Sequence, residues 1–323
     1  MIRTVKTNIL FGGSSKSVNL RYKWIGRFKG FILNMLAGII LIGISYIILS
    51  PIIGVIAVSV MSIDDLFNPM VYLIPENFTM DNIRYAMQYL DYWVLMSRTL
   101  VYSLGMAVLH VLVTSFVGYG FARYRFPGRG ILFGLLVFTI ILPVQTYMVP
   151  LFMQLRFFGV GPLEFNLIGG FSSIILLTLT GMGIRSGLFI YIYRQFFRGL
   201  PVEISEAALI DGAGPIRTFA TVMLPNSKPA TVTVLLFAFV WHYGDTFYSS
   251  MFMRGSRLMP ASLQNLLVNF MMNTGGGGTT LSFLRSQIVF YAGIVIVIVP
   301  ILVIYIILQR HFIEGLERSG IVG

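Results

Sequence analysis

Residues whose types could support catalysis are few in this sequence and are scattered along it. The three histidines, His110, His242 and His311, are far apart and form no metal-binding spacing, and the chain has no cysteine. The glycine-rich stretch at residues 12–16 lacks the Gly-Lys-Ser/Thr ending that a phosphate-binding loop requires. Because no catalytic constellation remains, we expect neither an enzyme nor a cofactor or metal bound by this chain.

The most informative residue spacing lies in a polar loop at residues 194–229. Pro201 favours the start of a helix, and the stretch from there to Ile210 contains no helix-breaking residue. Glu203 and Glu206 would lie in the first turns, where the helix dipole stabilises acidic side chains. We therefore expect a short helix with acidic residues near its start.

A turn and a second helical stretch are expected to follow this helix. Gly212 suits the left-handed conformation that commonly ends a helix, and residues 216–223 form a second stretch that we expect to end at Leu224 and Pro225. Such an element could rest on lipid headgroups. Acidic residues without a basic one before Gly214 oppose contact with an anionic membrane face, so we expect a docking surface for another protein.

The elements that position this loop are membrane spans. Of the 323 residues, 56% are hydrophobic and only 11% are charged, against about 25% in a typical soluble domain. The apolar residues form long blocks, each near or above the ~20 residues that cross a bilayer core, and the first block is too long for a signal peptide. We expect an all-α membrane protein with six transmembrane helices, at residues 31–59, 98–121, 131–155, 167–193, 230–252 and 286–308.

Basic residues set the expected orientation of these spans. They gather in residues 1–30, in the loops after the second and fourth spans, and at the C-terminal end, and these segments share one side if there are six spans. Since Lys and Arg favour the cytoplasm, both termini and the loop at 194–229 are expected there. The acidic segment at 61–97 would be outside. Three arginines before the sixth span oppose this pattern, but the total favours it.

The residue types and spacing in the polar loop are those of a known motif. Glu206-Ala207-Ala208, Gly212 and Leu224-Pro225 are similar to the EAA motif of inner-membrane permeases of binding-protein-dependent ABC importers. That pattern is Glu-Ala-Ala, three residues, Gly, nine residues and an Ile-x-Leu-Pro ending, and Val222 stands here in place of the Ile. The resemblance covers about residues 31–323, which it implies are one transmembrane permease domain of the MetI-like fold, after a cytoplasmic basic extension at 1–30.

The segments beside the motif resemble the carbohydrate-uptake branch of this family. Residues 193–201, before the motif, and residues 121–128, after the second span, are similar to segments of that branch. Trp241-His242-Tyr243-Gly244-Asp245 stands where the branch has Trp-x-x-Asn-Asp, with Gly244 replacing the Asn. Residues 309–323 resemble the end of MalG-like permeases of maltose-type systems.

The resemblance implies a transport mechanism with several partners in a bacterial plasma (inner) membrane. Such a permease pairs with a second, similar permease, two ATPase subunits hold ATP and Mg²⁺ below the pair, and a solute-binding protein outside delivers a carbohydrate, expected to be an oligosaccharide. The loop would be the coupling helix that fits a cleft on one ATPase, and no nucleic acid would be bound. The loop residues that the resemblance implies are in contact with the ATPase are Glu203, Glu206, Ala207, Ala208, Asp211, Gly212, Leu224 and Pro225.

A second group of candidates lies within the expected spans. Arg185 would sit roughly 13 Å from the cytoplasmic edge, where a charge is costly unless it is paired or hydrated. Aromatic residues with polar tips in the fifth span suit stacking and hydrogen bonding to sugars. Snorkelling of Arg185, and packing of the aromatic residues against the partner permease or the membrane interface, are the alternatives. The candidate substrate-pathway residues are Gln145, Tyr147, Arg185, Trp241, His242, Tyr243, Asp245 and Tyr248, and Pro143 and Pro150 predict a bent third span.

Two other functions remain open on the sequence. The chain could be an importer permease for a non-sugar solute, such as an amino acid, phosphate or polyamine. It could also be an ion-coupled secondary transporter, which would need intramembrane acids or an inverted repeat. Asp245 is the only clear acid within the expected spans, and no repeat is visible.

Overall fold

The computed structural model of the protein describes residues 15–160, 163–253, 257–273 and 280–320. Nearly all of its regular structure is helical, as the sequence predicts. The exception is a short antiparallel hairpin of β1 (Phe158–Val160) and β2 (Leu163–Phe165), which the all-α expectation missed. The chain forms two compact units, Met1–Ala57 and Val58–Gly323, and each is described by itself.

The first unit is built on the helix α1 (Ser15–Ser59), whose last two residues belong to the second unit. Its segment Gly30–Ser59 is long and apolar enough to cross a membrane, which agrees with the first expected span. The helix begins well before that span, so the later part of the basic N-terminal segment is also helical. The first 14 residues of that segment lie outside the described residues.

The second unit contains two further long apolar helices, α4 (Tyr92–Arg123) and α15 (Thr280–Gly320). With 32 residues, α4 is roughly 48 Å long at 1.5 Å per residue, longer than the ~30 Å hydrocarbon core. In α15 the candidate span is Thr280–Ile307. Among the described residues, three helices are therefore candidate spans. The number rises to five if two bent helix pairs, at residues 129–156 and 215–244, each count as one span.

Three of the expected spans are each divided into two helices. Residues 131–155 form α5 (Arg129–Ile141) and α6 (Val144–Arg156), which are bent by 109° at Pro143, as the prolines predict. Residues 167–193 form α7 (Phe171–Leu179) and α8 (Ser186–Gly199), and residues 230–252 form α12 (Lys228–Gly244) and α13 (Phe247–Phe252). The second break contains two left-handed residues, Gly181 with φ 74° and Arg185 with φ 57°.

The core of the second unit forms where α8 and α12 pack on α4. At the crossing of α4 and α8, a Cβ on Gly118 would lie 2.6 Å from the Tyr193 Cβ and 3.1 Å from the Ile190 carbonyl oxygen. Small residues allow such close helix contacts in membranes, where lipid offers no hydrophobic force to bring helices together. Gly118 is therefore required by the approach of the two backbones.

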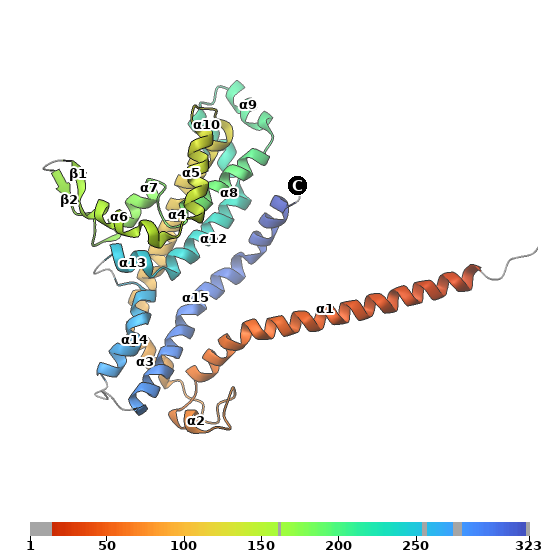
Figure 1. The fold of residues 1–323 in the computed structure, drawn as a ribbon, viewed down its shortest axis with the longest axis vertical. Helices are drawn as coiled ribbons and strands as arrows, with labels where there is room; N and C mark the ends of the chain where they lie inside the picture. The colour runs from red at the N-terminus through yellow and green to blue at the C-terminus, as the bar shows by residue number, and fades with distance from the viewer. Residues whose placement is uncertain (1–14, 161–162, 254–256, 274–279, 321–323) are drawn as a thin grey trace, which may run out of the picture. The chain divides into compact units, whose positions relative to one another are not determined.

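Short helices occupy the connections at one end of this unit, opposite the end that carries α9 (Val202–Ile210) and α10 (Pro215–Thr218) (Figure 1). They are α2 (Ile63–Phe67), α3 (Asp81–Tyr89) and α14 (Met259–Asn273), none of which the sequence analysis predicted. The run of four glycines at residues 275–278 lies outside the described residues, as does Arg254, one of the three arginines before the sixth expected span.

Hydrogen bonds hold the acidic connection before α4 in one shape. Both carboxylate oxygens of Asp65 accept hydrogen bonds from Asn77, and the Asn82 side chain donates to the Ser59 and Met61 carbonyl oxygens. Burial opposes ionisation of Asp65, but its hydrogen bonds with Asn77 and Ser62 outweigh this and hold its pKa below its ordinary value.

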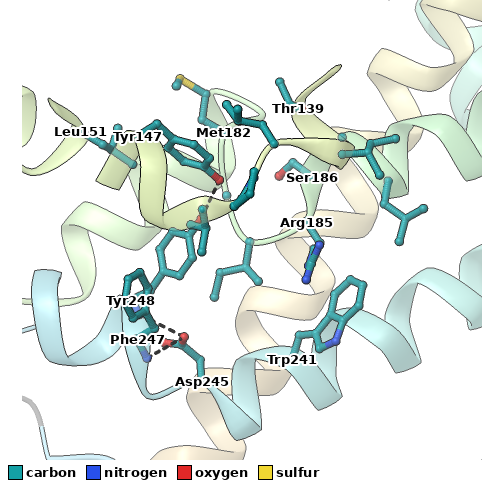
Figure 2. Close-up of a pocket in the computed structure, with 18 of the residues that line it drawn as sticks. Thr139, Tyr147, Leu151, Met182, Arg185, Ser186, Trp241, Asp245, Phe247 and Tyr248 are labelled. Carbon is teal, nitrogen blue, oxygen red and sulfur yellow. Dashed lines mark hydrogen bonds between the residues drawn. The ribbon is translucent and has the colours of Figure 1, made fainter. Parts of the chain in front are cut away.

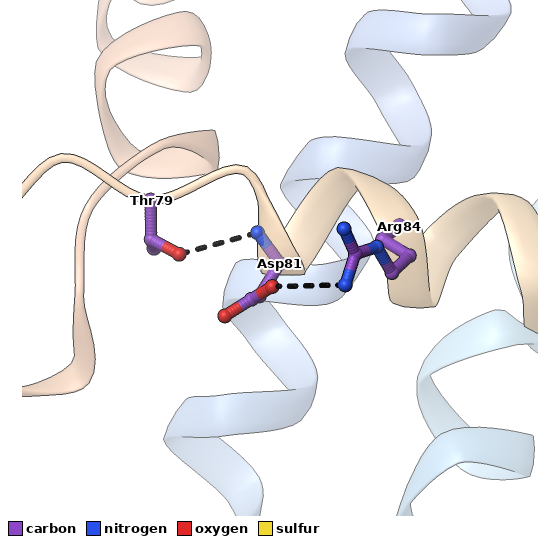
Figure 3. A network of polar contacts seen from close by, with 3 residues as sticks. All are labelled: Thr79, Asp81 and Arg84. Carbon is purple, nitrogen blue, oxygen red and sulfur yellow. Dashed lines mark hydrogen bonds and ion pairs between the residues drawn. The ribbon is translucent and has the colours of Figure 1, made fainter.

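The start of α3 carries a smaller polar network (Figure 3). The Thr79 hydroxyl oxygen accepts from the Asp81 amide, and the Asp81 carboxylate lies 3.8 Å from the Arg84 guanidinium. Because both charged side chains are largely exposed, this ion pair contributes little stability. The N-cap residue of α3 is Met80, which has no side-chain cap, and the Thr79 hydroxyl satisfies the Asp81 amide from one residue before it.

We predict that Gly118→Ala destabilises the protein by about 1–3 kcal/mol, because the added methyl group forces α4 and α8 apart. The matched control is Gly120→Ala on the same helix, where an added Cβ would meet no atom within 4 Å. Thermal unfolding of the detergent-purified protein measures both variants. Equal midpoints for the two variants would show that the α4–α8 contact is not as close as described.

Candidate functional site

The polar loop that the sequence singled out is a compact helical element. Its first helix, α9, spans Val202–Ile210 and begins directly after Pro201, as predicted. Gly212 has φ 79°, and the turn after α9 is closed by Ala213 N–H donating to the Ala208 carbonyl and Gly212 N–H donating to the Leu209 carbonyl. This pair of bonds is a Schellman motif, which requires a left-handed residue and explains the glycine.

The second helical stretch runs further than predicted. After α10 comes a π-helical turn, η1 (Phe219–Met223), and then α11 (Leu224–Asn226), so the expected end at Leu224 and Pro225 is wrong. In the wider turn the Leu224 amide bonds to the Phe219 carbonyl, five residues back. The chain bends only after Asn226, where α12 leaves at an angle of 82°.

Both arms of this loop are attached to the end of α4. The Arg123 guanidinium donates hydrogen bonds to the carbonyl oxygens of Leu200 (2.9 Å) and Pro201 (3.2 Å), at the joint between α8 and α9. On the other arm, the Phe219 ring packs against the rings of Phe116 and Tyr119, each 5.4 Å away. The loop is therefore a braced element rather than a flexible connector.

The exposed face of the loop carries acidic side chains beside apolar ones, of which Ile210 is 85% and Ile216 72% exposed. Glu203, Glu206, Ala207 and Asp211 are exposed, whereas Ala208 is only 8% exposed and packs toward the chain itself. Of the two alanines among the implied contact residues, only Ala207 is therefore open to a partner. Leu224 is also partly buried and packs against the core.

A cavity of about 1020 Å³ lies where the three broken spans meet (Figure 2). It is lined by the α5–α6 bend, by the segment between α7 and α8, and by the end of α12 with the start of α13. Irregular backbone at membrane depth is tolerated where it lines a cavity or is covered by protein, and transporters commonly bind substrate at such discontinuous helices. Six of the eight sequence candidates line the cavity: Gln145, Tyr147, Arg185, Trp241, Asp245 and Tyr248.

Aromatic and polar groups face each other across this cavity. The Arg185 guanidinium carbon lies 5.2 Å from the centre of the Trp241 ring, a cation–π contact that partly compensates its charge. The hydroxyl groups of Tyr147 and Tyr248 are 3.3 Å apart. Arg185 also has the left-handed backbone conformation that is uncommon outside glycine, a strain of a kind found at functional sites. Rings and hydrogen-bonding groups in this arrangement can bind a polar ligand with apolar faces.

Asp245 lines the cavity but is engaged by backbone. Its carboxylate accepts hydrogen bonds from the amides of Phe247, Tyr248 and Ser249, at 3.2, 3.0 and 2.8 Å, and so caps the start of α13. An ion-coupled transporter would need this carboxylate to bind the coupling ion, but here it already accepts three backbone hydrogen bonds. Among the residues described, no group of three or more His, Asp or Glu side chains is placed to hold a metal ion.

His242 and Tyr243 lie away from the cavity, inside the helix bundle. The His242 Nδ1 is 3.3 Å from the Tyr102 hydroxyl, and its ring lies 5.1 Å from that of His110. The Tyr243 hydroxyl donates to the Val297 carbonyl on α15 at 2.7 Å. These two candidates therefore pack within their own helix bundle, a position that neither the substrate-pathway expectation nor its alternative of packing against the partner permease or the membrane interface described.

Between α7 and α8 the sequence analysis named Arg185 alone and missed that the rest of this segment also forms a cavity wall. Residues 181–188 line the cavity, where Arg185 lies beside Trp241 (Figure 2), whereas the Ser186 hydroxyl is buried and lies 3.4 Å from the His110 Nδ1 inside the helix bundle. The signal was present, because Gly181 and Gly183 interrupt an otherwise apolar block and a Gly pair of this kind marks a possible break.

These features define a multi-pass membrane transport subunit, with a braced loop at one end and a cavity at broken spans. Residues 110–318 match the family model described as binding-protein-dependent transport system inner membrane component. The match covers more than half of the 323 residues, and the chain belongs to this family.

Several curated relatives are sugar permeases by name. The chain is 32% identical over 227 residues to the maltodextrin transport system permease protein MdxG of Bacillus subtilis, covering 70% of this chain and 74% of that protein. It is 30% identical to the alpha-glucoside transport system permease protein AglG of Rhizobium meliloti, over 77% of this chain. This chain spans 62% of the length of AglG.

A solved structure shares the fold. It is described as the crystal structure of a bacterial ABC transporter involved in the import of the acidic polysaccharide alginate, and one of its chains superimposes with a TM-score of 0.68. The alignment covers 94% of this chain and 100% of that chain at 21% identity. At this identity the likeness establishes the fold of the present chain and not its substrate.

We predict that Asp245 acts mainly as a helix cap. Asp245→Ala should cost about 0.5–2 kcal/mol of stability, because three amides at the start of α13 lose their acceptor, whereas Asp245→Asn should cost less because Asn is also a good cap. Thermal unfolding of the purified protein compares them, with Glu164→Ala as the control for loss of an exposed acid. If Asp245→Asn is as destabilising as Asp245→Ala, the carboxylate charge has another role.

Proposed function

We propose that this chain is a permease subunit of an ATP-binding cassette importer and forms half of the translocation pathway for a carbohydrate, most simply an oligosaccharide. The observation that carries the proposal is the braced, acidic helix–turn–helix of α9 to α11 in a member of this family. The names of its relatives, including MdxG and AglG, support a carbohydrate over another solute. The aromatic cavity supports the same substrate class.

The proposed topology has six spans in a bacterial inner membrane. They are α1, α4, the pairs α5–α6, α7–α8 and α12–α13, and α15. Both termini and the α9 end lie in the cytoplasm, because the basic residues gather in those segments. The acidic connection between α1 and α4 then lies outside.

The proposed partners follow from this arrangement. A second permease completes the pathway, a solute-binding protein delivers the sugar from outside, and two ATPase subunits hold ATP and Mg²⁺. Glu203, Glu206 and Asp211 present carboxylates that suit arginines on one ATPase. Because Arg123 and Phe219 join the loop to the end of α4, a displacement of α9 is passed to a long helix of the core instead of being absorbed.

Residues around the cavity are assigned roles by their contacts. Trp241, Tyr147 and Tyr248 offer ring faces and hydroxyl groups to sugar rings, and Arg185, which already contacts Trp241, donates hydrogen bonds at the wall. Gln145 lies beside them at the start of α6. Asp245 lines the cavity and caps α13, while His242 and Tyr243 pack behind this wall.

Topology is testable with single cysteines, since the chain has none of its own. Met70→Cys and Ile210→Cys make a matched pair, because these side chains are 88% and 85% exposed. A membrane-impermeant thiol reagent should label Met70→Cys in intact cells, and Ile210→Cys only after the membrane is opened. Labelling of Ile210→Cys from outside would overturn the proposed orientation.

Coupling and substrate are testable together in vesicles that contain this chain with its co-expressed partners. A panel of oligosaccharides with the binding protein should stimulate ATP hydrolysis and uptake. Glu206→Ala should weaken ATPase association by about 1.5–3 kcal/mol, the value of a charge-assisted hydrogen bond, and Gly212→Val should uncouple hydrolysis from uptake, since a side chain at this φ is strained by about 1–2 kcal/mol.

The control for both variants is Glu164→Ala, which removes an exposed acid outside the loop. It should leave stimulated hydrolysis and uptake unchanged. If Glu206→Ala and Gly212→Val both behave like this control, the loop is only a connector. If an amino acid, phosphate or polyamine stimulates the complex and no sugar does, the substrate class is wrong while the transport function stands.

A further inference from the structure

The seam between α5 and α8 brings arginines together in a way that transport does not require. The two helices run antiparallel and very close, since a Cβ on Gly187 would lie 2.5 Å from the Thr139 hydroxyl oxygen. Toward the α9 end, the Phe133 and Tyr191 rings stack with centroids 6.1 Å apart and planes 19° apart. The helices thus remain in contact along the seam.

The seam ends in three arginines. The Arg194 guanidinium carbon lies 3.6 Å from the centre of the Phe133 ring. Arg129 stands one helical turn before Phe133 on α5, and Arg198 one turn after Arg194 on α8, so both project toward the same end of the antiparallel pair. The positive charges of Arg198 and Arg129 both act on Arg194.

No acidic side chain balances this cluster within the part of the chain that the structure describes. The recorded ion pair of that part joins Arg84 to Asp81, and it lies in the connection before α4. Arg194 is 9% exposed, its Nε has no hydrogen-bond partner, and one terminal nitrogen donates to Gln195. Arg129 donates to the Tyr124 carbonyl. Guanidinium groups that repel one another here need an anion from outside the chain.

Helix dipoles do not explain the cluster. Arg198 lies in the last turn of α8, where a cation is favourable, but Arg129 is the first residue of α5, where the dipole disfavours it. A bound anion would compensate both the dipole and the mutual repulsion. Arginine is suited to phosphate, because its planar fork can donate two parallel hydrogen bonds.

The surroundings of the cluster indicate which phosphate would bind. None of the residues of α5 is buried in this chain, and Ile131, Leu132, Leu135 and Phe138 are exposed apolar residues that continue from the arginines into the span. An apolar strip that ends in basic residues matches acyl chains that end in a phosphate. A soluble anion has no acyl chains that could pack on this apolar strip.

We propose that Arg129, Arg194 and Arg198 bind the headgroup phosphate of an anionic phospholipid, with its acyl chains along α5. The site lies at the start of α5, whereas the cavity at the broken spans is lined by residues 139–141 at the other end of this helix. It is independent of the transported solute and adds a lipid ligand to the protein.

Native mass spectrometry of the detergent-purified complex that contains the full chain tests this site. The probes are phosphatidylglycerol and phosphatidylcholine of equal chain length, titrated separately. The double variant Arg129→Gln/Arg198→Gln removes two charges and leaves the packed Arg194 in place. Since a basic residue near the membrane contributes about 1 kcal/mol, phosphatidylglycerol should bind roughly 30-fold more weakly to this variant, with phosphatidylcholine unchanged.

Two controls keep the result specific. Arg125→Gln removes an exposed arginine of the same connection that is not on the seam, and it should bind phosphatidylglycerol as the unchanged protein does. Arg198→Lys keeps the charge and should retain most of the binding. Inorganic phosphate at millimolar concentration should not displace the lipid, because it lacks acyl chains.

Three outcomes would overturn the proposal. One is equal binding of the two lipids to the unchanged protein. Another is equal loss in Arg125→Gln and the double variant, which would mean a diffuse basic surface. The third is weakened ATPase association in the double variant with lipid binding intact, which would assign the arginines to the protein partner. None of these depends on which solute is transported, so the proposed function is judged separately.

Discussion

The structure depends most on the need to satisfy backbone hydrogen bonds in lipid. A helix provides every partner within itself, and α4 keeps this ladder unbroken over 32 residues, so it can serve as the support on which other elements pack. The segments that break the ladder do so at Pro143, between Gly181 and Arg185, and at Asp245. All three breaks meet at one cavity, where water or a ligand can satisfy the freed groups.

The same long helix links the cavity to the loop. Its far end holds the joint of α8 and α9 through Arg123 and supports the second arm through Phe219. Two helices connect the cavity with this loop: α8 begins at the cavity and ends at the loop, and α12 begins at the loop and ends at the cavity. A movement of α9 is therefore mechanically connected to the walls of the cavity through short, stiff elements, as rigid-body switching requires.

Several local features followed from the sequence because their causes are local. The start of α9 at Pro201 and the left-handed Gly212 were predicted correctly, since a proline and a glycine act on their own backbone. The bend at Pro143 was predicted for the same reason. The short helices α2, α3 and α14 were missed, because their amphipathic faces are stabilised by packing that no short sequence window contains.

The sequence by itself determined that this is a helical membrane protein, and it contained the helix and turn signals of the loop at residues 194–229, because apolar run length and turn residues are properties of the chain alone. Only the tertiary structure decided the partners of individual side chains. It turned Ala208 inward, used Asp245 as a cap, withdrew His242 and Tyr243 from the cavity, and collected Arg129, Arg194 and Arg198 at one seam. Those outcomes depend on which helix faces pack together, and residues far apart in the sequence meet only when packing is complete.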